Sequence, residues 1–235
     1  MDNLNIEIYA DGADLNSFME LNSKNFVKGF TTNPSLMKKS GIQDYSGFAK
    51  DLLSKIKDKP ISFEVFADDF TSMRSQAKKI NSWGRNVFVK IPITNTKGQS
   101  TSELVQSLNA ENIACNVTAI FTIEQVQSII DVVDDRTPVI LSIFAGRIAD
   151  SGIDPVPIIE KAVNLTKNKK NIKILWASTR ELLNIFQANK INCHIITVPN
   201  DILKKIDNIG KDQKSFSLET VVDFYNDANA AGYKI

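Results

Sequence analysis

Cysteine and histidine are scarce in this chain of 235 residues. The two cysteines, Cys115 and Cys193, lie in apolar, strand-like runs and are not spaced as CxxC. This spacing argues against a disulfide framework and favours a reducing compartment, the cytoplasm. The one histidine, His194, lies within the apolar run CHIITVP, where we expect it to pack inside the fold rather than to bind a ligand. We therefore expect neither a metal centre nor an organic cofactor.

Excess charge of one sign and long apolar runs are absent as well. The 28 basic and 27 acidic residues leave a formal net charge of +1, so nothing favours nucleic acid or an anionic membrane as a partner. The longest apolar runs are far shorter than the ~20 residues that span a bilayer. The acidic start MDNLNIEIYADGADL has no apolar signal-peptide core. We expect a cytoplasmic protein that does not bind membranes.

Short β-branched runs alternate with amphipathic segments along the chain. The predicted strands are residues 5–10, 28–32, 61–66, 87–92, 113–120, 138–144, 172–178 and 193–199. The predicted helices are residues 44–56, 70–83, 100–108, 122–133, 157–167, 179–189 and 217–230. Eight strands, each followed by helical material, predict an α/β fold, a single (β/α)8 TIM barrel over residues 1–235 with a C-terminal helix. The alternative is a doubly wound open sheet, but neither GxGxxG nor GxxxxGK[ST] occurs.

One predicted strand, VFVKIP (87–92), carries a lysine among apolar residues. An unpaired ammonium buried there would cost several kcal/mol. Polar residues occupy the same face of other strands, near the strand ends, and alone each has an ordinary explanation such as helix capping or β-propensity. The full set is Asp11, Glu64, Lys90, Asn116, Thr118 and Ser142. Because barrel enzymes keep their chemistry at the C-terminal ends of the strands, this set predicts an active site.

The lysine suggests the type of chemistry. A neutral amine attacks a carbonyl to form a Schiff base, and the iminium stabilises the carbanion left when a neighbouring C–C bond breaks. Such a reaction also needs carboxyl groups, one for the substrate hydroxyl and another for the water of imine formation. Asp11 and Glu64 are the candidates for these roles.

Five segments then resemble the transaldolase family, above all its short single-barrel bacterial members and the fructose-6-phosphate aldolases. They are GFTTNPSLMKKSG (29–41), FVKIP (88–92), NVTAIF (116–121), SIFAGRI (142–148) and WASTR (176–180). The resemblance covers nearly the whole chain, and TTNPS together with KIP is its most specific part. It implies Lys90 as the nucleophile and Asp11 as the general acid/base.

The resemblance implies roles for further residues. Glu64 and Thr118 would hold and activate the catalytic water. The implied substrate-binding residues are Asn33, Asn116, Ser142, Phe144, Arg147, Ser178 and Arg180. Asn33 and Asn116 would bind hydroxyls near the Schiff base, and the last three residues would bind the sugar phosphate, the arginines by bidentate hydrogen bonds. No metal is part of this set.

The expected activity is that of a transaldolase. A dihydroxyacetone unit would pass from sedoheptulose 7-phosphate to glyceraldehyde 3-phosphate, giving erythrose 4-phosphate and fructose 6-phosphate. Glu64 and Phe144 stand where the aldolases of the family carry glutamine and tyrosine, which favours transfer. The alternatives are a fructose-6-phosphate aldolase that releases dihydroxyacetone, a Schiff-base lyase for another sugar, and a catalytically lapsed barrel that binds sugar phosphates.

The sequence also departs from the family pattern. Gly12 replaces the threonine that is usual after the first aspartate, and Ile143 stands where a proline is common. The segment NTKGQST (95–101) is longer than the usual connection after the catalytic strand. These departures affect the expected acceptor and substrate, and they leave the catalytic residue types in place.

The C-terminal segment SLETVVDFYNDANAAGYKI predicts a partner. It presents more apolar residues than an end helix needs, namely Leu218, Val221, Val222, Phe224 and Tyr225. They could pack on the chain's own barrel, but short members of the resembled family place this helix on a neighbouring subunit within a ring. The resemblance therefore implies a homo-oligomer, with sugar phosphates as the substrates.

Overall fold

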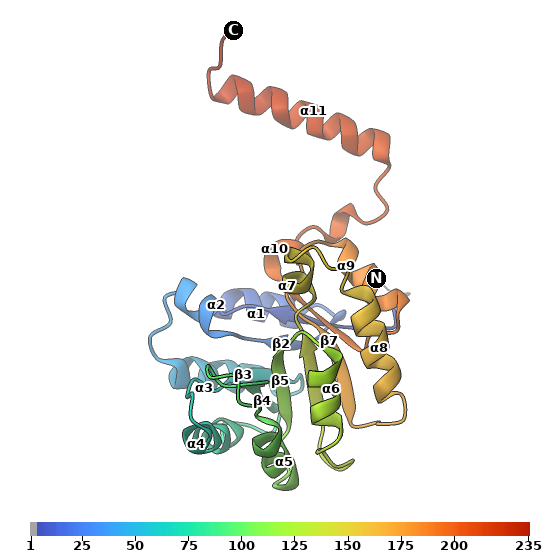
Figure 1. Ribbon diagram of the computed structural model, residues 1–235. Helices are drawn as coiled ribbons and strands as arrows, with labels where there is room; N and C mark the ends of the chain where they lie inside the picture. The colour runs from blue at the N-terminus through green and yellow to red at the C-terminus, as the bar shows by residue number, and fades with distance from the viewer. Residues whose placement is uncertain (1–3) are drawn as a thin grey trace. The chain divides into compact units, whose positions relative to one another are not determined.

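The barrel predicted from the sequence is present in the computed structural model, which describes residues 4–235. Eight parallel strands close in the order of the chain, and helices surround them (Figure 1). The strands are β1 (Glu7–Asp11), β2 (Val27–Thr31), β3 (Ile61–Glu64), β4 (Val87–Pro92), β5 (Cys115–Ile120), β6 (Val139–Ile143), β7 (Ile172–Trp176) and β8 (Ile195–Pro199). All eight predicted strands are confirmed, most of them with ends shifted by one or two residues.

The predicted helices of the barrel are confirmed too, and others appear that the sequence pattern missed. The helices are α1 (Leu15–Asn22), α2 (Pro34–Lys39), α3 (Tyr45–Lys55), α4 (Phe70–Asn81), α5 (Ser102–Ala110), α6 (Ile123–Ile130), α7 (Ala145–Asp150), α8 (Val156–Thr166), α9 (Leu183–Lys190) and α10 (Asn200–Leu203). The missed ones are α1, α2, α7 and α10. They are short and bury only a few side chains, so no repeating apolar stripe marks them.

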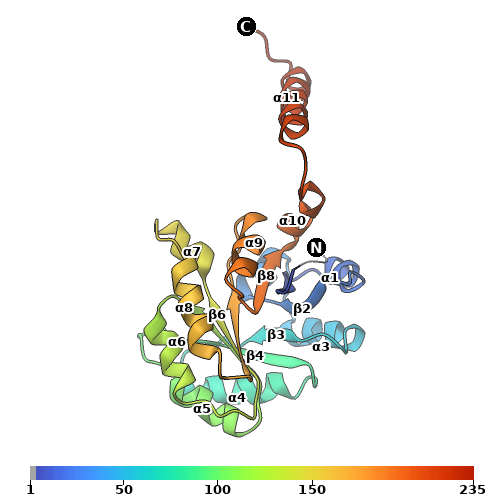
Figure 2. The same ribbon diagram turned by 90° about the vertical axis from the view of Figure 1, so that its right-hand side faces the viewer.

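Side chains that alternate along the strands form two cores, one between the strands and the helices and one inside the barrel. In β4, Val87, Val89 and Ile91 are buried on the face toward the surrounding helices, which Figure 2 shows outside the strands. Inside the barrel, Tyr9 packs with apolar residues of β6, β7 and β8. The Tyr9 ring leaves no room at Gly29, where an added Cβ would lie 2.6 Å from it. This apolar cluster occupies part of the barrel interior.

The cysteines and the histidine have structural surroundings. Both cysteines are buried and unpaired, and burial raises the pKa of each thiol to about 12. His194 is partly buried before β8, and its Nδ1 accepts a hydrogen bond from the Ile174 amide at 3.0 Å. Among the described residues, no group of three or more His, Cys, Asp or Glu side chains is placed to hold a metal ion.

The chain divides into two compact units, one ending at Leu203 and one formed by Lys204–Ile235. The second unit contains a 3-10 turn, η1 (Ile206–Asn208), and the helix α11 (Gln213–Ala230). Asp212 caps α11 by accepting a hydrogen bond from the Ser215 amide, so the helix begins before the predicted Ser217. None of the residues of α11 is buried. That residues 1–235 form one domain stays a prediction.

No helix within residues 4–235 combines the length and the apolar character that crossing a membrane requires.

Candidate functional site

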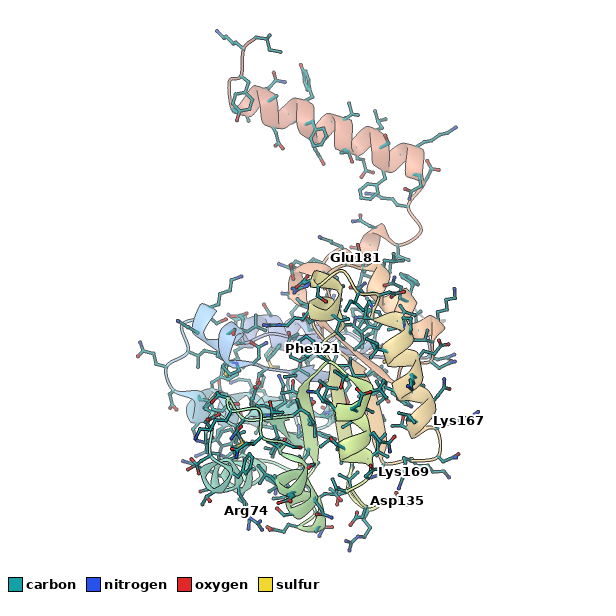
Figure 3. The ribbon with its side chains drawn as sticks, in the orientation of Figure 1. Arg74, Phe121, Asp135, Lys167, Lys169 and Glu181 are labelled. Atoms are coloured by element: carbon teal, nitrogen blue, oxygen red, sulfur yellow. The ribbon has the colours of Figure 1, made fainter. Side chains whose placement is uncertain are left out.

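A cavity of about 590 Å³ opens at the C-terminal ends of the strands. Glu181, just after β7, lies at this end of the barrel, while Asp135 and Lys169 lie at the other (Figure 3). Every side chain that the sequence predicted for the site lines the cavity: Asp11, Asn33, Glu64, Lys90, Asn116, Thr118, Ser142, Phe144, Arg147, Ser178 and Arg180. The structure thus brings the predicted set together, and the role of each residue stays a prediction.

The lysine of β4 has a charged partner. Lys90 exposes 8% of its side chain, and its Nζ lies 3.1 Å from Oε2 of Glu64. The ammonium also donates to the Thr32 carbonyl oxygen at 3.0 Å. Glu64 and Lys90 pair in register on β3 and β4, so neighbouring strands place the two charges side by side. Pairing removes most of the penalty that an isolated buried ammonium would carry.

The backbone of Glu64 is hydrogen-bonded by a residue that the sequence did not indicate. The hydroxyl of Tyr45, at the start of α3, accepts from the Glu64 amide at 2.7 Å and donates to the Glu64 carbonyl at 3.1 Å. These bonds satisfy the backbone where β3 ends. They fix the strand end and with it the direction in which the carboxylate leaves the backbone.

Asp11 ends β1 and is partly buried at the cavity. Thr31 on β2 donates to Asp11 Oδ1 at 2.8 Å. Desolvation by the surrounding barrel raises the pKa of the Asp11 carboxyl above its ordinary value. The positive charge of Lys90 and the Thr31 hydrogen bond oppose this rise, and the negative charge of Glu64 adds to it. A carboxyl with a raised pKa is suited to both taking up and returning a proton.

Asn116 is held in one orientation. Its Nδ2 donates to Ser62 Oγ at 3.0 Å, and its Oδ1 accepts from Ser142 Oγ at 2.6 Å. The three residues come from β5, β3 and β6, and all are buried. Because the amide nitrogen has two hydrogens, one donor is left for a ligand hydroxyl.

Thr118 carries a hydroxyl with an open hydrogen-bonding capacity. Its Oγ1 is buried and has no hydrogen-bond partner among the described residues. The next residue, Ala119, has a left-handed backbone with φ of 59°, and the β5–β6 register shifts between Val117 and Ile120. A buried, unsatisfied hydroxyl in a cavity is a place for a water or a substrate hydroxyl.

The two arginines come from different elements that are packed tightly together. An added Cβ at Gly146 would lie 1.8 Å from the Ser178 carbonyl oxygen and 2.9 Å from Arg180 Nε. Only glycine allows this approach of α7 to the end of β7. Ser178 itself has a left-handed φ of 62°. This close packing brings Arg147 and Arg180 to the edge of one cavity.

Each arginine is also held by a neighbour. The Arg147 guanidinium lies 5.8 Å from the centre of the Phe144 ring, a cation–π contact. Arg180 pairs through Nη2 with Asp150, and both side chains of this pair are about half exposed. A guanidinium has five N–H donors in a planar fork, so each arginine retains donors for a phosphate.

Asn33 has a structural task that the prediction did not include. Its Oδ1 accepts from the Leu36 amide at 2.9 Å and so caps α2. The amide NH2 is then the part of this side chain that can donate to a ligand. The hydroxyl binding predicted for Asn33 can use only that group.

Several residues at the site were missed by the sequence reasoning, among them Thr31, Ser62 and Thr197. All three lie on the inward face of their strands and are buried. Alternation along the strands could have found them, as it found Asn116. Tyr45 has no such signal, because it lies among the apolar residues of a helix.

Comparison with known proteins places the chain among relatives. The family model for transaldolase/fructose-6-phosphate aldolase matches residues 8–234. A probable transaldolase from Thermoanaerobacter sp. (strain X514) is 34% identical over 202 residues, which cover 86% of this chain and 89% of the relative. A probable transaldolase from Nitrosopumilus maritimus (strain SCM1) is 32% identical over 206 residues, covering 86% and 87%.

Solved structures support the fold. The crystal structure of KGPDC from Streptococcus mutans aligns with a TM-score of 0.58 over 86% of this chain and 91% of that one. At 12% identity, this likeness concerns the fold alone. With the family model matching almost the whole barrel and relatives above 30% identity, the chain belongs to the transaldolase/fructose-6-phosphate aldolase family.

Proposed function

We propose that this protein is a Schiff-base transaldolase that moves a dihydroxyacetone unit between sugar phosphates. The observation that carries the proposal is the buried Lys90 Nζ, 3.1 Å from the Glu64 carboxylate in a cavity that Asp11 also lines. The donor is sedoheptulose 7-phosphate or fructose 6-phosphate. The acceptor is glyceraldehyde 3-phosphate or erythrose 4-phosphate.

Imine formation uses the lysine–glutamate pair. The ammonium gives its proton to Glu64, and the free amine attacks the ketone carbon of the donor. Glu64 then returns this proton to the carbinolamine hydroxyl, which leaves as water, and the iminium remains on Lys90. The buried hydroxyl of Thr118 has no hydrogen-bond partner among the described residues. It binds the water that leaves when the imine forms and that returns when the imine is hydrolysed.

Carbon–carbon cleavage uses Asp11. Its carboxylate takes the proton from the donor hydroxyl on the carbon beyond the breaking bond. The bonding electrons move into the iminium and form an enamine, while the oxygen becomes the carbonyl of the departing aldehyde. When an acceptor aldehyde binds, the enamine attacks it, and Asp11 returns the proton to the new hydroxyl. The raised pKa of Asp11 suits this exchange.

Transfer, rather than release of dihydroxyacetone, rests on Glu64 and Phe144. Phe144 lines the cavity without a hydroxyl that could hold a hydrolytic water. We expect fructose 6-phosphate alone to yield little dihydroxyacetone, and added erythrose 4-phosphate to yield sedoheptulose 7-phosphate rapidly. Phe144→Tyr should increase dihydroxyacetone release. Coupled assays of both products, with and without the acceptor, measure this balance.

The matched control is Phe121→Tyr. The Phe121 ring lies 6.1 Å from that of Phe144, but Phe121 does not line the cavity, so the same chemical change there should not alter the product ratio. Equally fast release of dihydroxyacetone without an acceptor would make the protein an aldolase. Binding of sugar phosphates without any turnover would make it a lapsed barrel.

We also propose that the protein is a homo-oligomer that associates through α11. Leu218, Val221, Val222 and Tyr225 follow the spacing of one helix face, and all four are exposed. Light scattering of the full chain at micromolar concentration should give a multiple of 26.1 kDa. Leu218→Asp should reduce that mass, whereas Thr220→Asp, on the opposite helix face, should not. A monomer mass for the unaltered protein would refute the proposal.

A further inference from the structure

Two threonine hydroxyls form a hydrogen-bond chain that ends on the Asp11 carboxylate. The reaction steps above do not use these hydroxyls. Thr31 on β2 donates to Asp11 Oδ1 at 2.8 Å, and the Thr31 and Thr197 hydroxyl oxygens lie 2.5 Å apart. Thr197 belongs to β8, and β2 and β8 flank β1 on its two sides. Their side chains therefore meet inside the barrel, below Asp11.

The hydrogen count gives this chain a direction. A threonine hydroxyl has one hydrogen and two lone pairs. Because Thr31 gives its hydrogen to Asp11, the contact with Thr197 is made only if Thr197 donates to Thr31. The order is thus Thr197 to Thr31 to Asp11, and each bond polarises the next. The backbone at Thr197 is held as well, since Thr179 Oγ1 donates to the Thr197 carbonyl at 2.7 Å.

From this geometry we infer that Thr197 is a positioning residue, which acts through Thr31 to hold Asp11 Oδ1 and leave Oδ2 for the substrate proton. The inference rests on the proposed function only in taking Asp11 as the base of carbon–carbon cleavage. Thr31 and Thr197 line the cavity, yet they are only 3% and 5% exposed, so their hydroxyls hydrogen-bond within the protein. Neither residue was assigned a role by the sequence.

The charged groups around Asp11 allow the effect of the Thr197 hydroxyl on the pKa of Asp11 to be isolated. Lys90 on β4 and Glu64 on β3 are the charges that act on it, and the adjoining β2 and β8 contribute the two hydroxyls. The helix α10 packs on β1 and β8 and carries Asp201, which is exposed to solvent. The helix α1 packs on β2, and Asp14 before it caps that helix. Removing the Thr197 hydroxyl changes none of these charges.

Thr197→Val should weaken the Thr31 hydrogen bond and so raise the pKa of Asp11, since a hydrogen bond to the charged form lowers a pKa. Carbon-13 NMR of labelled aspartate, with Asp11→Asn for assignment, measures this without relying on activity. If Asp11 acts as the base, kcat for donor cleavage should fall about fivefold at neutral pH, the equivalent of one hydrogen bond of about 1 kcal/mol. The acid limb of the profile should move to higher pH, and KM should change less than twofold.

Two variants separate positioning from structure. Thr197→Ser keeps the hydroxyl and should restore both the pKa and kcat. Thr137→Val removes a buried hydroxyl that donates to the Asn109 carbonyl at 3.0 Å, outside the cavity, and should lower stability without moving the Asp11 pKa. An unchanged Asp11 pKa in Thr197→Val, or an equal shift in Thr137→Val, would overturn the inference. A rise in KM alone would instead make Thr197 a substrate contact.

Borohydride trapping with fructose 6-phosphate keeps this test apart from that of the proposed function. Thr197→Val should still form the Lys90 adduct, because Asp11 is not needed for imine formation. If the unaltered protein forms no adduct, the proposed function fails, and the NMR titration still decides the role of Thr197.

Discussion

Lys90→Ala is expected to abolish turnover and to prevent borohydride trapping of a substrate adduct. A methyl group cannot attack a carbonyl, so the first step of the proposed reaction has no nucleophile. Lys90→Arg should fail equally, because a guanidinium stays protonated and cannot form the imine. Mass spectrometry after trapping with fructose 6-phosphate reports the adduct, its position and the size of the fragment together.

The loss of turnover and trapping in Lys90→Ala must be distinguished from unfolding of the variant. Glu64 keeps 16% of its side chain exposed at the cavity, so water can hydrate its charge once Lys90 is gone, and we expect the variant to stay folded. Lys173→Ala is the matched control, since Lys173 is also a strand lysine paired with a glutamate, Glu7 on β1. It should trap the adduct normally. A normal adduct in Lys90→Ala would mean that another amine is the nucleophile.

Arg180→Ala and Arg147→Ala are each expected to weaken binding of sugar phosphates strongly. Both guanidiniums line one edge of the cavity, where a phosphate could accept from both. Because Arg180 is about half exposed, we expect KM to rise about 10- to 100-fold, or ~1.4 to 2.7 kcal/mol, around the lower end of the ~2 to 5 kcal/mol that truncating a buried charged partner costs. Steady-state kinetics with phosphorylated and unphosphorylated ketoses measure the difference.

The comparison between phosphorylated and unphosphorylated donors decides whether the two arginines bind the phosphate group. An unphosphorylated ketose such as fructose should lose little, since it has no phosphate group for the guanidiniums to bind. Arg136→Ala is the control for removing an ion-paired arginine, because Arg136 pairs with Asp134 in the connection between α6 and β6. Equal losses on both kinds of donor would show that Arg147 and Arg180 act through the structure of α7 and the β7 end instead.

Much of the barrel and most of the site followed from local patterns. The alternation of strand residues depends only on the geometry of an extended chain, so it assigned Lys90, Asn116 and Ser142 to the interior before any contact was known. The arginines were different. Arg147 and Arg180 lie beyond the strand ends, where no period applies, and only resemblance to known segments gave them a role.

By itself, then, the sequence determined the number of strands and which of their polar residues face inward. Only the tertiary structure decided which groups meet. The pairing of Lys90 with Glu64 depends on the register of β3 and β4, and the contact of Thr31 with Thr197 depends on barrel closure, which brings β2 and β8 to either side of β1. The need for glycine at position 146 likewise arises from a carbonyl more than 30 positions later in the chain. Such contacts join residues far apart in the sequence, and no local pattern carries that information.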